Sequence, residues 1–220
     1  MRTLYSRFIF LLLFSLGVSL TLFTQTTNWT GTNSSDWFDA GNWSAGVPTA
    51  TSTANIPSAA NNPEIDGNAT ASAEEVNIDF AGQLTIKNGS QLDLQAITID
   101  DGTLLIESNA TLNSTSSTID GITLSQATAS VTNNGTISVS NSNFDGIYLD
   151  NGAASFTNNG TITITSAGVD GISMYDGAAT FTNDGSITIN GTSFDGIFLE
   201  NGATFTNNNS IFIVNTSDDG

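Results

Sequence analysis

Apolar and polar residues alternate in short runs through the second half of the chain. Every second side chain in such a run is apolar, which is the pattern of a strand with one buried face. The runs recur in a unit of about 25 residues. Each unit holds three runs, separated by turn-forming stretches such as "DNGA" and "NNGT". The pattern predicts three short strands per unit and no helix.

The units align on an Asp-Gly pair. They begin at Asp120, Asp145, Asp170 and Asp195, and Asp219 begins a fifth as the chain ends. The aligned apolar columns are Ile122, Ile147, Ile172 and Ile197, then Leu124, Leu149, Met174 and Leu199, then Val131, Phe156, Phe181 and Phe205, then Ile137, Ile162, Ile187 and Ile211, and finally Val139, Ile164, Ile189 and Ile213. Repetition at a fixed period in this range indicates a solenoid. Three strands per coil without a crossover helix predict an all-β, right-handed parallel β-helix.

Asparagine and glycine also form columns at one predicted turn. The asparagines are Asn133, Asn158, Asn183 and Asn207, and the glycines after them are Gly135, Gly160 and Gly185, with Asn209 in the last unit. Stacked Asn amides hydrogen-bond from one coil to the next, so the asparagines need no ligand to explain them. We expect the glycines to occupy left-handed turn positions.

A looser form of the same pattern lies upstream. Residues 82–94 ("GQLTIKNGSQLDL") and 102–114 ("GTLLIESNATLNS") align 20 residues apart. Residues 64–119 therefore form shorter coils, and the helix is predicted to begin between Glu64 and Val76. Residues 25–63 are predicted to be an amino-terminal β cap, because the first coil of a solenoid otherwise exposes its interior. We expect Trp29, Trp37 and Trp43 to form the core of this cap rather than a sugar-binding platform.

The amino-terminal residues 1–24 have the order of a secretory signal peptide. Arg2 and Arg7 precede an apolar run from Phe8 to about Phe23. A membrane anchor is the alternative, because the run approaches the length that spans a bilayer. Cleavage is expected after Ser19 or after Thr24. The predicted localisation is secreted or at the bacterial cell surface, and residues 120–220 are expected to be part of a longer protein, because no carboxyl-terminal cap follows the repeats.

The acidic composition of the chain limits the classes of molecule that it can bind. The chain holds 3 Lys and Arg residues, 21 Asp and Glu residues, and neither His nor Cys. Removal of the signal peptide leaves Lys87 as the single basic side chain. Nucleic acid and anionic membrane surfaces are therefore excluded as partners, since both require positive charge. Without Cys, the exported chain is stabilised by packing and hydrogen bonds.

Two groups of residues resemble known proteins. The phrases "FTNNGTITI" and "DGIYLDNGA" resemble repeats of autotransporter-like and haemagglutinin-like bacterial adhesins, in which "TNxGTI" recurs from coil to coil. The phrase "WTGTNSSDWFDAGNWSAGVPT" resembles a segment near the mature start of large secreted surface proteins of gram-negative bacteria. The resemblance covers about residues 29–48 and 120–213. It implies a structural or adhesive passenger region whose partners are host or environmental glycans or proteins.

Enzymatic activity has little support in these residues, and we predict no catalytic, cofactor-binding or metal-binding residue. A polysaccharide lyase needs a basic side chain as its base, and only Lys87 remains after export. The adjacent pairs Asp100–Asp101 and Asp218–Asp219 are the carboxylates available to a hydrolase, but neighbouring strand residues point to opposite faces. A polysaccharide-acting enzyme with catalytic residues outside this chain stays as the alternative.

The Asp column and one hydroxyl column suggest two other binding functions. Stacked carboxylates about 4.8 Å apart repel by roughly 1 kcal/mol per pair even in water. Backbone hydrogen bonds offset this repulsion, or else calcium does, although one Asp per coil supplies few of the six to eight oxygens that calcium requires. The hydroxyl column suggests ice binding, and Phe212 interrupts it; its members are Thr136, Ser138, Thr161, Thr163, Ser186 and Thr188.

The variable outward positions are the remaining candidates for ligand contact. They are Tyr148, Ser173 and Phe198, with Tyr175 close by in the sequence. Exposed aromatic side chains here serve glycan binding or packing between coils, and the pattern does not separate the two.

Overall fold

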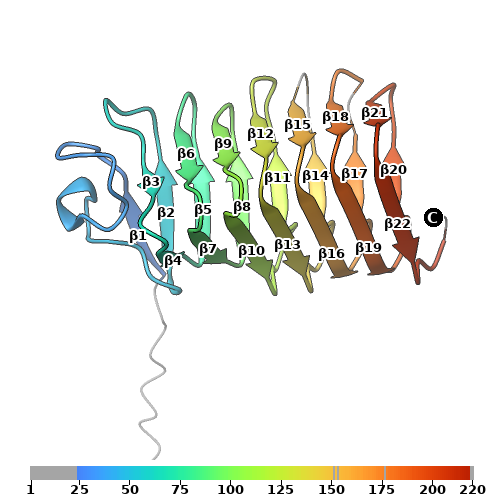
Figure 1. The fold of residues 1–220 in the computed structure, drawn as a ribbon, viewed down its shortest axis with the longest axis horizontal. Coiled ribbons are helices and arrows are strands. Elements are labelled where there is room, and N and C mark those ends of the chain that lie inside the picture. The colour runs from blue at the N-terminus through green and yellow to red at the C-terminus, as the bar shows by residue number, and fades with distance from the viewer. Residues whose placement is uncertain (1–23, 151, 153, 176, 219–220) are drawn as a thin grey trace, which may run out of the picture.

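The computed structural model describes residues 24–150, 152, 154–175 and 177–218. These residues form an all-β solenoid whose coils are stacked in chain order along the long axis (Figure 1). Three parallel sheets run the length of the stack, and each of seven coils contributes one strand to each sheet. The predicted parallel β-helix with three strands per coil is confirmed. The predicted signal peptide, apart from Thr24, lies outside the described residues.

The largest sheet, here the β1–β20 sheet, has eight strands in the order β1-β2-β5-β8-β11-β14-β17-β20. Its strands are β1 (Gln25–Asn28), β2 (Ser52–Ile56), β5 (Glu75–Ile78), β8 (Ala96–Ile99), β11 (Ile122–Leu124), β14 (Ile147–Leu149), β17 (Ile172–Met174) and β20 (Ile197–Leu199).

The other two sheets have seven strands each. The β3–β21 sheet contains β3 (Glu64–Ile65), β6 (Gln83–Ile86), β9 (Thr103–Ile106), β12 (Ser130–Asn133), β15 (Ser155–Asn158), β18 (Thr180–Asn183) and β21 (Thr204–Asn207). The β4–β22 sheet contains β4 (Thr70–Ser72), β7 (Gln91–Leu94), β10 (Thr111–Thr115), β13 (Thr136–Ser140), β16 (Thr161–Ala167), β19 (Ser186–Thr192) and β22 (Ser210–Val214). The described residues contain no helix long and apolar enough to cross a membrane.

Strand register agrees with the aligned columns of the sequence. Phe156 pairs with Phe181, which pairs with Phe205, and the upstream pair Leu84 and Leu104 is also in register. The Phe156 and Phe181 rings stack with centroids 4.6 Å apart, and Phe181 and Phe205 stack at 4.9 Å. The alternating apolar residues therefore form one continuous core inside the solenoid.

The asparagine column forms the predicted ladder of amides. Asn133 Nδ2 donates to Asn158 Oδ1 at 2.8 Å, and Asn158 Nδ2 donates to Asn183 Oδ1 at 2.7 Å. Asn183 Nδ2 continues the ladder to Asn207 Oδ1 at 2.7 Å. The first three side chains are fully buried. Their amides are satisfied by one another and by backbone groups, which accounts for the column.

The glycine prediction at the same turn was wrong. Gly135, Gly160 and Gly185 are absent from the glycines with positive φ. Glycine is required at Gly160 for space, because a Cβ there would lie 2.1 Å from the Gly135 carbonyl oxygen. One column of left-handed residues lies instead at the ends of strands of the β4–β22 sheet: Ser116, Asn141 and Asn215 directly follow β10, β13 and β22, and Ser166 and Gly191 are the second-to-last residues of β16 and β19.

The amino-terminal segment closes one end of the stack. Trp29, Trp37 and Trp43 are buried, and Trp43 packs edge-on against the other two with ring centroids 5.0 and 4.8 Å away. This agrees with their expected place in a cap core. The segment also contains the 3-10 helix η1 (Ala40–Asn42). Glu64 N donates to Ser35 O at 2.7 Å, so the cap pairs with the first strand of the β3–β21 sheet and protects its edge.

The first coil begins earlier in the chain than the alternating pattern indicated. Strand β2 starts at Ser52, within the stretch predicted to be cap and upstream of the expected start between Glu64 and Val76. It pairs with β5 as an ordinary member of the β1–β20 sheet. The coil was missed because β3 and β4 have only two and three residues, too few to show alternation.

Candidate functional site

The Asp column lies where the chain enters the β1–β20 sheet, two residues before β11, β14, β17 and β20. The carboxylates of Asp120, Asp145 and Asp170 each accept a hydrogen bond from the backbone of the following coil. Asp120 Oδ1 accepts from Asp145 N at 2.9 Å, Asp145 Oδ1 from Asp170 N at 2.8 Å, and Asp170 Oδ1 from Asp195 N at 2.9 Å. These bonds are the backbone contacts that the sequence suggested as the offset for carboxylate repulsion.

The middle of the column is buried. Asp145 is 8% exposed and Asp170 is 7% exposed. The pKa of Asp145 is raised from 3.8 to about 7, chiefly by burial; the charges of Asp120 and Asp170 contribute to this increase, and the hydrogen bond from Asp170 N opposes it. Burial also raises the pKa of Asp120 and of Asp170. The column therefore holds carboxylates in an environment that disfavours their charge.

Two rows of larger side chains flank the column. One row contains the residue directly before each Asp, and its members Phe144 and Phe194 are 54% and 52% exposed. The other row contains Tyr148 and Phe198 on β14 and β20, with Tyr175 just after β17. The Tyr148 and Tyr175 ring centroids are 6.4 Å apart, and those of Tyr175 and Phe198 are 6.1 Å apart.

Between the two rows lies a hollow of about 440 Å³, which we call the acidic–aromatic groove. Its lining residues are Ile119, Asp120, Phe144, Asp145, Tyr148, Val169, Asp170, Ser173 and Tyr175. It runs over neighbouring coils rather than into the core. Burial and the charge of Asp150 raise the pKa of Tyr148 to about 12, and the charge of Glu200 raises that of Tyr175.

The sequence identified only part of this groove. Tyr148, Tyr175 and Phe198 pack on one another across coils, and Tyr175 remains 48% exposed. Ser173, predicted to point into solvent, is buried at 3% exposure between the longer side chains of its column. The pattern did not single out Phe144 and Phe194, although an apolar residue precedes every one of the four Asp-Gly pairs from Asp120 to Asp195, and that column was the available signal.

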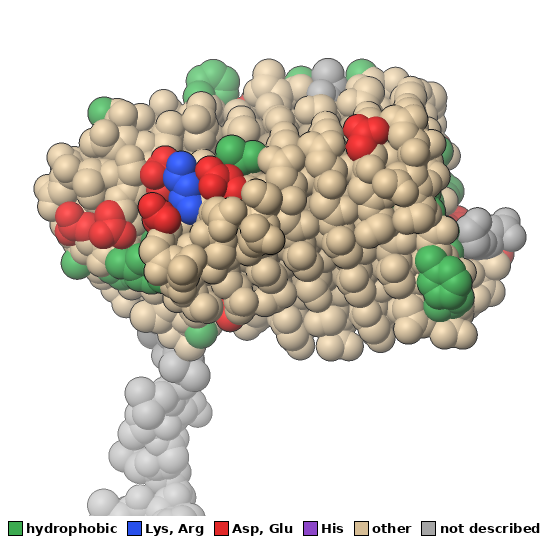
Figure 2. Space-filling model, in the orientation of Figure 1, with side chains coloured by type: hydrophobic (Ala, Val, Ile, Leu, Met, Phe, Trp, Pro, Cys, Tyr) green, Lys and Arg blue, Asp and Glu red, His purple; other side chains and the backbone are tan. Residues whose placement is uncertain are grey.

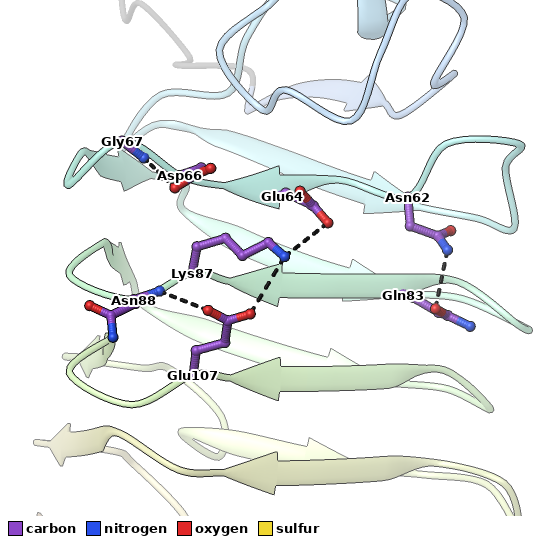
Figure 3. Close-up of polar contacts among 8 residues, drawn as sticks. All are labelled: Asn62, Glu64, Asp66, Gly67, Gln83, Lys87, Asn88 and Glu107. Carbon is purple, nitrogen blue, oxygen red and sulfur yellow. Dashed lines mark hydrogen bonds and ion pairs between the residues drawn. The ribbon is translucent and has the colours of Figure 1, made fainter.

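The basic residue that was considered as a lyase base lies outside the acidic–aromatic groove. Lys87 follows β6 in the β3–β21 sheet, and its Nζ lies 3.2 Å from Glu64 Oε1 and 3.4 Å from Glu107 Oε1 (Figure 3). The hydrogen bond to Glu64 raises the pKa of Lys87. A lysine held protonated by carboxylates on both neighbouring coils is poorly suited to act as a catalytic base. Figure 2 shows this lone blue side chain among red carboxylates near the amino-terminal coils.

The carboxylates of Asp100 and Asp101, the first of the two adjacent pairs, have structural partners. Asp100 Oδ1 accepts from Ser125 Oγ at 3.2 Å, and Asp101 Oδ1 accepts from Thr128 N at 2.9 Å. Asp101 also has a φ of 55°, a turn conformation. Asp218 N donates to Phe194 O at 3.4 Å, and Asp219 lies outside the described residues.

The described part of the chain holds no group of three or more acidic side chains that could bind a metal ion. Along the Asp column, one oxygen of Asp120, Asp145 and Asp170 is already used by a backbone N–H. Calcium requires six to eight oxygens, so this geometry offers it little.

The hydroxyl column lies on β13, β16 and β19 of the β4–β22 sheet, where Thr136, Thr161 and Ser186 are in register. Phe212 interrupts it on β22 and is 61% exposed. Much of the face in Figure 2 is tan, the colour of the backbone and of side chains that are neither apolar nor charged. Unlike this hydroxyl-bearing face, the acidic–aromatic groove has exposed aromatic side chains on several coils.

The chain matches the model of a protein family described as a domain of unknown function (DUF8693), over residues 28–143. Because the match covers more than half of the 220 residues, the chain belongs to that family. No curated protein and no solved structure matches the chain. The matched region contains most of the cap and ends directly before Phe144, so most of the groove lies beyond it.

Proposed function

We propose that this DUF8693 family member is an exported structural region of a bacterial surface or secreted protein, and that it binds an extracellular ligand along the acidic–aromatic groove. The observation that carries the proposal is the concentration of half-exposed aromatic rings on one side of the solenoid. Phe144, Tyr175 and Phe194 are each about half exposed on adjacent coils. Clustered apolar side chains on a polar protein surface are typical of interaction sites.

The solenoid supports a role in display. Each coil packs on its neighbours through three parallel strands, so the stack is extended and its lateral surface is long. Export is favoured by the basic and apolar order of residues 1–24, and the resemblance of the repeats to adhesin passengers favours adhesion.

We propose binding without a reaction for these residues. The groove carboxylates are bound to backbone N–H groups, and Lys87 is in a different sheet, paired with Glu64 and Glu107. General acid–base chemistry needs a proton donor and acceptor poised at one substrate. None of the groove residues forms such a pair across an open cleft.

A screen of glycans and extracellular proteins with the purified full chain tests the proposal. The groove variant is Phe144→Ser combined with Tyr175→Ser, and the matched control is Phe212→Ser, which removes an exposed ring from the β4–β22 sheet. We expect specific ligands that the groove variant loses and the control keeps. Equal binding by both variants contradicts the groove assignment. Release of depolymerised glycan products would indicate that the chain is an enzyme and not only a binding protein.

A further inference from the structure

We propose that the acidic–aromatic groove receives lysine side chains of a basic segment of a partner protein. This inference rests on the proposed function, because it names the ligand class of the same groove. We expect the groove to bind a cationic protein segment in preference to neutral glycans.

Charge complementarity supports a cationic ligand. The groove contains Asp120, Asp145 and Asp170, and Asp150 and Glu200 lie close to its tyrosines. The described residues contain one basic side chain, and it is paired with Glu64 and Glu107 in another sheet. Within that part of the chain, no basic side chain neutralises the groove. Its field therefore attracts cations and repels anionic ligands.

The shape of the groove favours a lysine side chain. The carboxylates of Asp145 and Asp170 belong to residues more than nine-tenths buried, between the row of Phe144 and the row of Tyr148. Lysine carries a compact ammonium on a flexible four-carbon stem, and such stems pack along apolar surfaces while the charge reaches a polar partner. The stem would contact the rings, and the ammonium would meet the carboxylates.

The repetition favours a segment with several lysines over a single free amine. Successive coils place one carboxylate about every 4.8 Å along the groove. Linked side chains bind neighbouring carboxylates with an intramolecular advantage once the first is bound. An ammonium also requires fewer ligand oxygens than calcium, which suits carboxylates that already accept a backbone N–H.

The affinity of the groove for lysine side chains should depend on pH, because binding is coupled to the loss of a proton. Asp145 is partly protonated near neutral pH, because burial raises its pKa to about 7. The titratable groups beside it are Asp120, Asp170 and Tyr148, and the charge of Asp150 acts on Asp120 and Tyr148. An ammonium beside Asp145 favours the ionised form, so binding releases a proton. Affinity should therefore rise by roughly tenfold between pH 6 and pH 8.

Calorimetric titration of the full chain with tetralysine tests the inference. The matched ligand is tetralysine with acetylated side chains, which keeps the stems and removes their charges. We expect binding of tetralysine alone, strongest at pH 8 and low salt. Asp145→Asn should lower the affinity at pH 8 by about tenfold and weaken the pH dependence. Asp66→Asn, at an exposed turn whose carboxylate accepts Gly67 N, should change neither.

Three outcomes overturn the inference. They are equal binding of both peptides, unchanged affinity in Asp145→Asn, or an equal loss in Asp66→Asn. The Phe144→Ser variant checks the groove independently, since an exposed residue is replaced without disturbing the core. If neutral oligosaccharides bind and tetralysine does not, the inference fails while the proposed function stands. If neither tetralysine nor any ligand of the screen depends on the groove, both fail.

Discussion

Replacing Asp145 by Asn should stabilise the fold. Asp145 lies between Asp120 and Asp170 and is 8% exposed, and its Oδ1 accepts Asp170 N at 2.8 Å. The side-chain amide of Asn keeps an oxygen for that N–H and removes a buried charge. The substitution thus separates the cost of the charge from the benefit of the hydrogen bond.

The size of the effect follows from the pKa of Asp145, which rises from 3.8 to about 7, mainly through burial. Because folding disfavours the ionised form, its cost is absent below pH 3.8, grows as the pH rises to about 7, and is complete above that. The two pKa values correspond to a cost of ~4 kcal/mol at 1.36 kcal/mol per pKa unit. Water at the open side of the groove screens the charge, and we halve the figure to ~2 kcal/mol.

Urea unfolding followed by far-ultraviolet circular dichroism measures this cost at pH 4, 6 and 8. The free energy of unfolding comes from linear extrapolation, and each variant is compared with the parent chain at the same pH. Asp145→Asn should match the parent at pH 4 and exceed it by ~2 kcal/mol at pH 8. Asp66→Asn, on an exposed turn, should stay within ~0.5 kcal/mol of the parent throughout.

Two results would refute the reasoning. A loss of stability in Asp145→Asn at pH 8 means that the charge-assisted hydrogen bond to Asp170 N outweighs desolvation. An equal gain at pH 4 and pH 8 means that the stabilisation does not come from removing charge. If Asp145→Asn is more stable yet binds tetralysine more weakly, the column is a case of stability given up for binding.

Four substitutions test the interior of the stack by the same unfolding assay. Phe181→Ala should cost ~3–5 kcal/mol, because its ring is fully buried between two stacked rings, whereas Phe205→Ala should cost less than ~2 kcal/mol, because Phe205 is only partly buried; equal costs would show that stacking is not cumulative. Asn158→Ala should cost about 3 kcal/mol, since it leaves the buried Asn133 Nδ2 without its ladder acceptor and the buried Asn183 Oδ1 without its ladder donor; a change below ~0.5 kcal/mol would contradict the ladder. Gly160→Ala should cost roughly 1–3 kcal/mol, because the new Cβ would lie 2.1 Å from a backbone oxygen of the preceding coil; a neutral result would show that the coils separate easily.

In the 25-residue units, the strands, their register and the core follow from the sequence pattern. Alternation with a period of two assigns each side chain to the interior or the surface, and the 25-residue repeat states which residues of successive coils are neighbours. The repeat alone therefore places Phe156, Phe181 and Phe205 in one column, and the pairing of β15, β18 and β21 confirms it. The asparagine ladder follows from the same repeat.

Tertiary structure decided what the turns do and how the groove is formed. Gly160 was predicted to adopt a left-handed conformation, but the proximity of the preceding coil explains it, and that proximity appears only when coils are stacked. The groove joins Phe144, at a turn, with Tyr148, on the following strand, across the buried Asp145. The repeat determined which residues of successive coils are neighbours, because equivalent residues of successive units stack on one another. Which columns face one another within a coil depends on backbone turns that a pattern of apolar and polar residues does not encode.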